Sequence, residues 1–227
     1  MSGVVNADGF GVGWYVPWSG DEPAVYRSDY PLWSDRTFAG IASRIRTRTA
    51  FAAVRNATPG LPVEESGTPP FASGPFMFVH NGAIEDFRRT AMRPLRNALS
   101  DKSYAGLLGT TDSETIFAVL LDGLRRSSSD LAQALAGSVR HLTEVCAKLG
   151  LRATLNLAVT DGKEMAFARY STEGPGNSLY YVEDGRAFSE AVVVASERLD
   201  GDAGWREVPD RHMLLVNSNS GAVLRPL

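Results

Sequence analysis

Two consecutive amphipathic patterns in the middle of the chain constrain its fold most strongly. Residues 115–126 and 130–149 repeat apolar side chains three and four positions apart, as one buried face of a helix does. Strand-forming runs lie on both sides of this pair, at 4–16, 24–27, 50–54, 76–79, 154–160, 163–170, 179–182, 191–195, 212–216 and 222–225. Strands, two helices and strands again indicate an α+β fold with helices packed on two sheets. We expect residues 1–227 to form a single domain, because no internal repeat or low-complexity linker divides them.

The charge balance and the cysteine count exclude several kinds of partner. The chain has 23 Lys and Arg against 26 Asp and Glu, and no basic block of the kind that binds nucleic acid. No stretch is apolar enough to span a membrane, and the first residues lack a signal-peptide pattern, so we expect a cytoplasmic protein with no membrane partner. One cysteine and three dispersed histidines predict no metal site and no cofactor.

The first strand-like run alternates glycine with large apolar residues. Its two faces would carry Phe10, Val12, Trp14 and Val16 on one side and Gly9, Gly11 and Gly13 on the other. A face without side chains lets another backbone or a ligand come close. The spacing does not match a dinucleotide-binding fingerprint, and no helical pattern follows it.

The apolar run at 76–79 is followed at once by three polar or flexible residues, His80, Asn81 and Gly82. We expect the strand to end there in a polar tip. An Asn side-chain donor beside a Gly N–H is the chemistry that stabilises an oxyanion in acyl transfer. Asn-Gly is also the commonest tight hairpin signal, and on spacing alone an ordinary turn is the stronger interpretation.

Two charged residues stand at the ends of predicted elements. Arg55 follows an apolar strand, where its planar fork suits bidentate capture of a carboxylate, although a structural salt bridge fits equally well. Asp112 opens the first predicted helix, between Thr111 and Glu114, which match a capping box. The capping box does not need Asp112, although an acid there also suits the helix dipole.

The remaining segments give weaker expectations. We predict an amphipathic helix at 35–47, an irregular loop at 59–74, a partly helical stretch broken by Pro94 at 85–99, and a polar loop at 100–109. Cys146 falls on or beside the apolar stripe of the second helix, so we expect it in the core rather than as a nucleophile.

Four signatures occur in one order, at 6–14, 53–58, 80–82 and 111–114. Together they resemble the class II glutamine amidotransferase domain, an N-terminal-nucleophile hydrolase, and are most similar to the γ-glutamyl hydrolases of the ergothioneine pathway. Each motif is weak alone, but their order and spacing are fairly specific for the superfamily. The resemblance covers essentially the whole chain.

This resemblance implies a four-layer αββα sandwich, with the active site at the strand ends between two antiparallel sheets. It assigns the oxyanion hole to Asn81 and the Gly82 N–H. The one small-molecule partner implied is a γ-glutamyl substrate. Arg55 would bind the α-carboxylate of this substrate and Asp112 its α-amino group. Thr58 and His80 would line the pocket. These roles agree with the chemistry read from the residues themselves: a fork donor, an acid, and donors for a developing negative charge.

The sequence departs from the family pattern at the nucleophile. In the family this is an N-terminal cysteine a few dozen residues before the Asn-Ala-Asp-Gly motif that begins here at Asn6, and no cysteine stands there. Ser2 would lie at the edge of the wrong strand, and Cys146 is expected in the core. We expect a start codon assigned too far downstream, with truncation or a natural loss of catalysis as alternatives. An in-frame upstream extension opening Met-Cys would decide between them.

The leading function is therefore hydrolysis of a γ-glutamyl amide to release glutamate, by resemblance from γ-glutamyl-hercynylcysteine sulfoxide. Without the cysteine, the 227 residues should bind this group but hardly turn it over. The alternatives are a glutaminase that passes ammonia to a separate synthase and a catalytically dead γ-glutamyl-binding protein. A missing strand would leave an apolar sheet edge, so a homo-oligomer is also possible.

Overall fold

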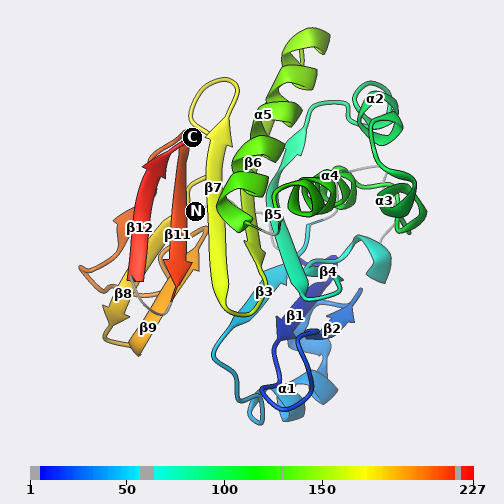
Figure 1. The fold of residues 1–227 in the computed structure, drawn as a ribbon. Helices are drawn as coiled ribbons and strands as arrows, with labels where there is room; N and C mark the ends of the chain where they lie inside the picture. The colour runs from blue at the N-terminus through cyan, green and yellow to red at the C-terminus, as the bar shows by residue number, and fades with distance from the viewer. Residues whose placement is uncertain (1–5, 57–63, 129, 218–220) are drawn as a thin grey trace.

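A six-stranded antiparallel sheet forms the centre of the structure, a computed structural model that describes residues 6–56, 64–128, 130–217 and 221–227 (Figure 1). The described strands form three sheets, with the orders β12-β11-β7-β6-β5-β4, β2-β1-β3 and β10-β8-β9. The strands are β1 (Phe10–Trp14), β2 (Ala24–Ser28), β3 (Ala50–Val54), β4 (Phe71–Ser73), β5 (Phe76–Ile84), β6 (Ala153–Thr160), β7 (Glu164–Ser171), β8 (Tyr180–Gly185), β9 (Phe188–Ala195), β10 (Arg206–Glu207), β11 (His212–Asn217) and β12 (Gly221–Pro226). Neighbouring strands all pair antiparallel, as Phe78 with Val159 in the β5–β6 pair.

Helices α4 (Asp112–Arg126) and α5 (Leu131–Leu149) cover one face of the large sheet. Their apolar faces and the facing strand residues form the larger core, which includes Phe78, Phe117 and Leu142. The Phe78 and Phe117 rings stack with their centroids 5.2 Å apart. The 3.6-residue period at 115–126 and 130–149 thus predicts both helices correctly, because their buried stripes face the sheet.

The two small sheets lie on the opposite face of the large sheet. Phe51, Met77, Phe167, Tyr181 and Leu214 come from β3, β5, β7, β8 and β11 and share a second core between the sheets. Helix α1 (Arg36–Ala42) covers the outer side of the β1–β2–β3 sheet, where the Phe38 ring lies 5.0 Å from Phe10 and 5.1 Å from Tyr26. Helix, sheet, sheet and helix therefore follow one another, and the expected α+β fold with αββα layers is confirmed.

The glycine face of β1 looks into the layer between the sheets. A Cβ atom on Gly11 would overlap the Pro69 carbonyl group, and one on Gly13 would overlap the sulfur of Met77. Glycine is needed at both positions because another backbone and a buried side chain come this close. The prediction of a close approach is correct, and protein rather than ligand makes it.

Three local predictions were wrong in part. The helix expected at 35–47 is α1 and ends at Ala42. The polar segment 100–109 contains α3 (Asp101–Ala105), because the Ser100 side chain caps its first turn. Helix α2 (Met92–Asn97) includes Pro94 in its first turn, where a proline removes no intrahelical hydrogen bond.

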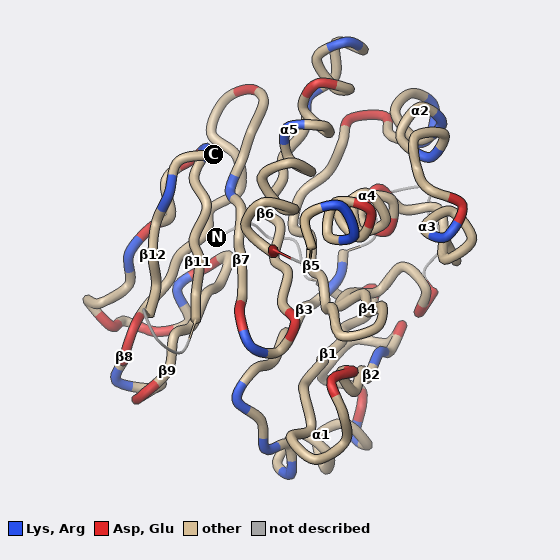
Figure 2. Tube along the Cα trace, in the orientation of Figure 1, with Lys and Arg blue, Asp and Glu red and all other residues tan. Residues whose placement is uncertain are grey.

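Acidic and basic residues are interspersed along the described trace (Figure 2). Arg152 with Glu85 and Arg169 with Glu207 form ion pairs at 3.1 and 2.6 Å. None of the described helices combines the length and the hydropathy that crossing a membrane requires.

Candidate active site

Strand β5 runs straight through the residues that were expected to form a polar tip. Its pairing with β6 continues from Met77 to Ile84, and Asn81 lies opposite Asn156. The prediction that the strand ends before His80 was wrong, and so was the alternative of a hairpin turn. Continuous pairing with a distant strand overrides the local Asn-Gly signal.

The outer edge of β5 is open along its second half. Strand β4 pairs only with residues 76–78 of β5, and no described strand covers the same edge further on. The Ile84 N–H points to this edge, since it donates to Asp112 rather than to β6. Because amide groups alternate along an antiparallel strand, Gly82 presents its N–H to the same side. No described strand pairs with this N–H, which is a donor of the kind that an oxyanion hole needs.

The neighbourhood of Gly82 leaves no room for a side chain. A Cβ atom there would overlap the Thr154 carbonyl oxygen, lie 2.7 Å from the Thr154 carbonyl carbon, and lie 2.8 Å from Nε2 of His80. The glycine is therefore required by close packing between β5 and β6, independently of any turn.

Asp112 joins the first turn of α4 to the open edge of β5. Its Oδ2 accepts the Ile84 N–H at 3.0 Å, and its Oδ1 accepts the Ser113 N–H at 2.8 Å. The Ser113 hydroxyl is a weaker third partner, 3.4 Å from Oδ1, so of the about four acceptor positions of a carboxylate at least one is left for a ligand. Asp112 is half-buried, and an ammonium group is a partner that fits the remaining positions.

His80 is buried and holds the same helix to the same strand. Its Nδ1 lies 3.0 Å from Oγ of Ser113, and its Nε2 lies 3.1 Å from the Thr154 carbonyl oxygen. The carbonyl oxygen can only accept, so Nε2 carries the proton. With both ring nitrogens engaged, His80 positions β5 against α4 and does not present a nitrogen to a substrate.

Asn81 points its side chain to the opposite face of the sheet from His80, since successive residues of a strand alternate. Its Oδ1 accepts a short hydrogen bond from Nδ2 of Asn177, in the segment between β7 and β8. The side chain is exposed, and its own Nδ2 makes no hydrogen bond to any described residue. That donor is available to a ligand.

Arg55 follows β3, the apolar strand expected before it, which lies at the edge of its sheet, and the arginine itself is buried. Its Nη1 donates to the Glu64 carbonyl oxygen at 3.2 Å, and a Cβ atom on Gly67 would lie 2.9 Å from its Nη2. The same Gly67 position is 3.4 Å from the Thr111 methyl group, so Arg55 lies close to the start of α4. Burial lowers the pKa of Arg55, while Asp8 and Glu64 oppose that effect.

The capping box at the start of α4 forms only in half. Thr111 accepts the Glu114 N–H at 3.1 Å, as a capping residue does. The Glu114 carboxylate, however, accepts the N–H groups of Leu108 and Gly109 at 2.6 and 2.8 Å. Glu114 thus fixes the turn that leads into Asp112. The sequence does not show this, because a capping box would bond Glu114 to Thr111 instead.

Of the six predicted site residues, five lie around β5 and the start of α4, and Thr58 lies outside the described residues. Cys146 is completely buried on α5, and burial raises the pKa of its thiol, which suits a core residue. Within the described part of the chain, no three His, Cys, Asp or Glu side chains gather as metal ligands would.

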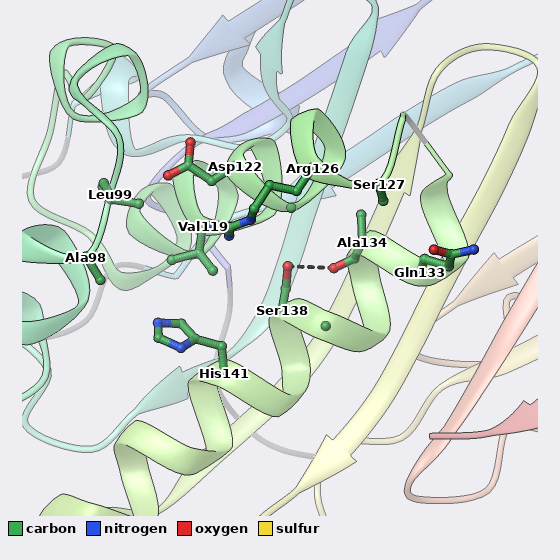
Figure 3. Close-up of a pocket in the computed structure, with 12 residues that line it drawn as sticks. Ala98, Leu99, Val119, Asp122, Arg126, Ser127, Gln133, Ala134, Ser138 and His141 are labelled. Atoms are coloured by element: carbon green, nitrogen blue, oxygen red, sulfur yellow. Dashed lines mark hydrogen bonds between the residues drawn. The ribbon is translucent and has the colours of Figure 1, made fainter.

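A groove of about 530 Å³ lies elsewhere, between the second half of α4, helix α5 and the segment at Ala98 and Leu99 (Figure 3). None of the predicted site residues lines it. Its buried acid, Asp122, accepts hydrogen bonds from Ser100 and Ser103 and pairs with Arg125. Burial raises the pKa of Asp122, but these partners outweigh burial and leave the pKa below its usual range.

The cluster around β5 and α4 combines three kinds of chemistry. Arg55 can pair with a carboxylate, Asp112 can accept from an ammonium group, and the Asn81 side chain and the Gly82 N–H can donate to a developing oxyanion. An amino acid whose side chain ends in an acyl group carries all three complementary features.

Comparisons with known proteins point to the same chemistry. The family model of class II glutamine amidotransferases matches residues 2–225. A γ-glutamyl-hercynylcysteine sulfoxide hydrolase of Mycolicibacterium smegmatis is 33% identical over 99% of this chain and 84% of its own length. A solved glutamine aminotransferase class-II domain protein of Silicibacter pomeroyi has a TM-score of 0.78 and 30% identity, over 96% of this chain and 91% of its own. The glutamine phosphoribosylpyrophosphate amidotransferase of B. subtilis shares the fold, with a TM-score of 0.67 at 18% identity, over 97% of this chain and 43% of its own.

Proposed function

The chain belongs to the class II glutamine amidotransferase family, and from that premise we propose that it is an amidohydrolase acting on γ-glutamyl-hercynylcysteine sulfoxide. Hydrolysis would break the γ-glutamyl amide bond with one water molecule, giving glutamate and the free amine of hercynylcysteine sulfoxide. The observation that carries the proposal is the full-length likeness to the mycobacterial hydrolase of that name.

The roles proposed for the described residues follow their positions. Arg55 binds the α-carboxylate of the glutamyl group and Asp112 its α-ammonium group, which places the γ-carbonyl beside Asn81 and Gly82. Their two donors stabilise the oxyanion that forms as the amide carbonyl is attacked. Each interaction with the oxyanion is stronger in the transition state than in the substrate, which is what accelerates the reaction.

Neither of the residues considered as a nucleophile, Cys146 and Ser2, is assigned that role. Cys146 is buried in the α5 core and lies on none of the elements that carry the proposed donors. Ser2 lies outside the described residues. We therefore assign the described residues to substrate binding and oxyanion stabilisation, and we assign the nucleophile to neither Cys146 nor any other described residue.

Two measurements test the proposal. Calorimetry should detect binding of L-glutamate, and absence of binding would contradict the assigned site. Release of glutamate should then be compared between γ-glutamyl-hercynylcysteine sulfoxide and glutamine. A strong preference for the sulfoxide supports the hydrolase, a preference for glutamine supports the glutaminase alternative, and binding without release from either supports the binding-protein alternative.

Where turnover is measured, Asn81→Ala should lower kcat by about 100-fold or more, as loss of one oxyanion-hole donor does. A cytoplasmic location and a homo-oligomeric state stay predictions, which fractionation and light scattering would test.

A further inference from the structure

The side chain of Asn81 has one hydrogen-bond partner among the described residues, and it comes from far along the chain. Nδ2 of Asn177 donates to Oδ1 of Asn81 and also lies 3.4 Å from the Asn81 backbone oxygen. The two residues are 96 positions apart. Asn177 therefore touches the residue to which the oxyanion hole is assigned from a segment that the family motifs do not include.

These contacts fix which end of the Asn81 carboxamide faces the site. The backbone oxygen of Asn81 can only accept, so the Asn177 atom that contacts it must be the nitrogen. A nitrogen donor next to the Asn81 side chain selects the oxygen of that side chain as its acceptor. The Asn81 nitrogen, with both of its hydrogens, is then left to donate to the reacting group.

The position of Asn177 is itself fixed by two buried side chains. Its backbone oxygen accepts from Nε of Arg169 at 2.9 Å and from Nδ2 of Asn156 at 3.2 Å. Asn156 also donates to the Ser178 oxygen at 2.8 Å. Arg169 is held in turn by the Val208 carbonyl oxygen. The segment that carries Asn177 is therefore tied to β6 and β7 next to Asn81.

Asn156 makes these bonds at the expense of its other amide atom. Its Oδ1 is buried and has no hydrogen-bond partner among the described residues. A buried acceptor without a partner is unfavourable and uncommon, and it points to a functional constraint on the side chain. Asn156 lies directly opposite Asn81, so the bonds that it makes hold residue 177 beside Asn81.

We propose that Asn177 is a positioning residue that turns the Asn81 carboxamide so that its nitrogen donates to the oxyanion. This inference rests on the proposed function. Asn177 is not assigned a contact with the substrate. Asn156 and Arg169 support it by holding its backbone.

The test uses two ligands that differ at the γ-carboxyl group, with affinities measured by competition calorimetry on the 227-residue chain. L-Glutamate places a negatively charged oxygen where the oxyanion forms, whereas L-norvaline keeps the α-groups and has only a methyl group in that place. Asn177→Ala should weaken glutamate binding about tenfold, the effect of losing an oriented hydrogen bond to a charged group. Asn177→Asp should weaken it further, because a carboxylate attracts the Asn81 nitrogen and turns the oxygen toward the ligand. Norvaline affinity should not change in either variant.

Glu173→Gln is the matched control, because Glu173 is exposed in the same segment and its backbone contact is unaffected by the change. It should bind both ligands as the wild type does. If the wild type binds glutamate and the Asn177 variants bind it equally well, the inference is wrong and the proposed function stands. An equal loss of affinity for both ligands would show that the role of Asn177 is only structural and would also overturn the inference. A wild type that binds neither ligand would remove the proposed function and the inference with it.

Discussion

Oδ2 of Asp112 accepts the backbone N–H of Ile84 at 3.0 Å, so the first turn of α4 is fastened to the open edge of β5. This contact brings the proposed ammonium partner to the same strand as Gly82 and Asn81. The acid therefore has a structural partner as well as a proposed ligand, and the two roles can be separated.

Asp112→Asn separates them, since asparagine keeps an acceptor oxygen for the Ile84 N–H but loses the negative charge and the second oxygen, which accepts the Ser113 N–H. We expect L-glutamate to bind about tenfold more weakly or worse, which corresponds to roughly 1.5 kcal/mol or more for a charged hydrogen bond. Calorimetry at pH 7 measures the change. Asp101→Asn is the control, because Asp101 occupies the first turn of α3 and is exposed. An equal loss of glutamate affinity in both variants would show that the effect is not specific to Asp112.

Arg55 donates from Nη1 to the Glu64 carbonyl oxygen, and the α-carboxylate is its proposed ligand. Lysine cannot reproduce a bidentate fork, so Arg55→Lys should reduce the preference for L-glutamate over L-isoglutamine, in which the α-carboxylate is an amide, by about tenfold. Competition calorimetry with the two ligands gives this ratio directly.

Arg27→Lys is the matched control for Arg55. Arg27 is another arginine that holds the same segment, through Nε and Nη2 at 2.9 and 2.7 Å from the Pro70 oxygen. Arg27→Lys should loosen this segment and lower thermal stability without changing the ratio of the affinities for L-glutamate and L-isoglutamine. A ligand ratio that stays constant in Arg55→Lys would remove the carboxylate assignment.

Gly82→Ala tests the packing between β5 and β6. The added Cβ would overlap the Thr154 carbonyl group and press on His80, so we expect a loss of roughly 1–3 kcal/mol in the free energy of unfolding. Gly137→Ala is its counterpart, because Gly137 lies in α5 with no atom within 4 Å of a new Cβ. This helix substitution should stabilise the protein by about 0.5–1 kcal/mol. Urea denaturation measures both, and a Gly82→Ala protein as stable as wild type would contradict the close approach.

The sequence predicts best those elements whose pattern is regular over many neighbouring residues. The apolar stripes at 115–126 and 130–149 correspond to α4 and α5, and the runs around Asp161 and Gly162 form the β6–β7 hairpin. In each of these the deciding contacts lie a few residues apart, so a local pattern contains them.

Two of the errors occur where a distant partner contributes to the structure. β5 continues to Ile84 because β6 pairs with it, and α3 forms where Ser100 and Ser103 bond to Asp122, in another helix. The site follows the same rule. Arg55 and Asp112 stand at the ends of recognisable elements and could be singled out, whereas Asn177 belongs to the site only through a contact with a strand 96 positions away.

The buried thiol of Cys146 gives a prediction about accessibility and turnover. The side chain is completely covered in the α5 core, so it should react with a thiol reagent such as 5,5′-dithiobis(2-nitrobenzoate) only after unfolding. Cys146→Ala should leave glutamate release, where it is measured, at the wild-type rate. A rate that falls by 100-fold in this variant, with folding intact, would make Cys146 part of the reaction.

The same thiol should make stability depend on pH in alkaline solution. Burial raises the pKa of Cys146 in the folded protein, whereas in the unfolded chain the thiol titrates near its ordinary value of about 8.5. Above that pH the unfolded state loses a proton that the folded state keeps, so the free energy of unfolding falls as pH rises. Urea denaturation between about pH 7 and 9.5 should therefore show the wild type losing stability relative to Cys146→Ala. Burial also raises the pKa of Tyr15, but that residue is common to both proteins, so the difference between them isolates the thiol. Parallel curves for the two proteins would contradict a buried, protonated Cys146.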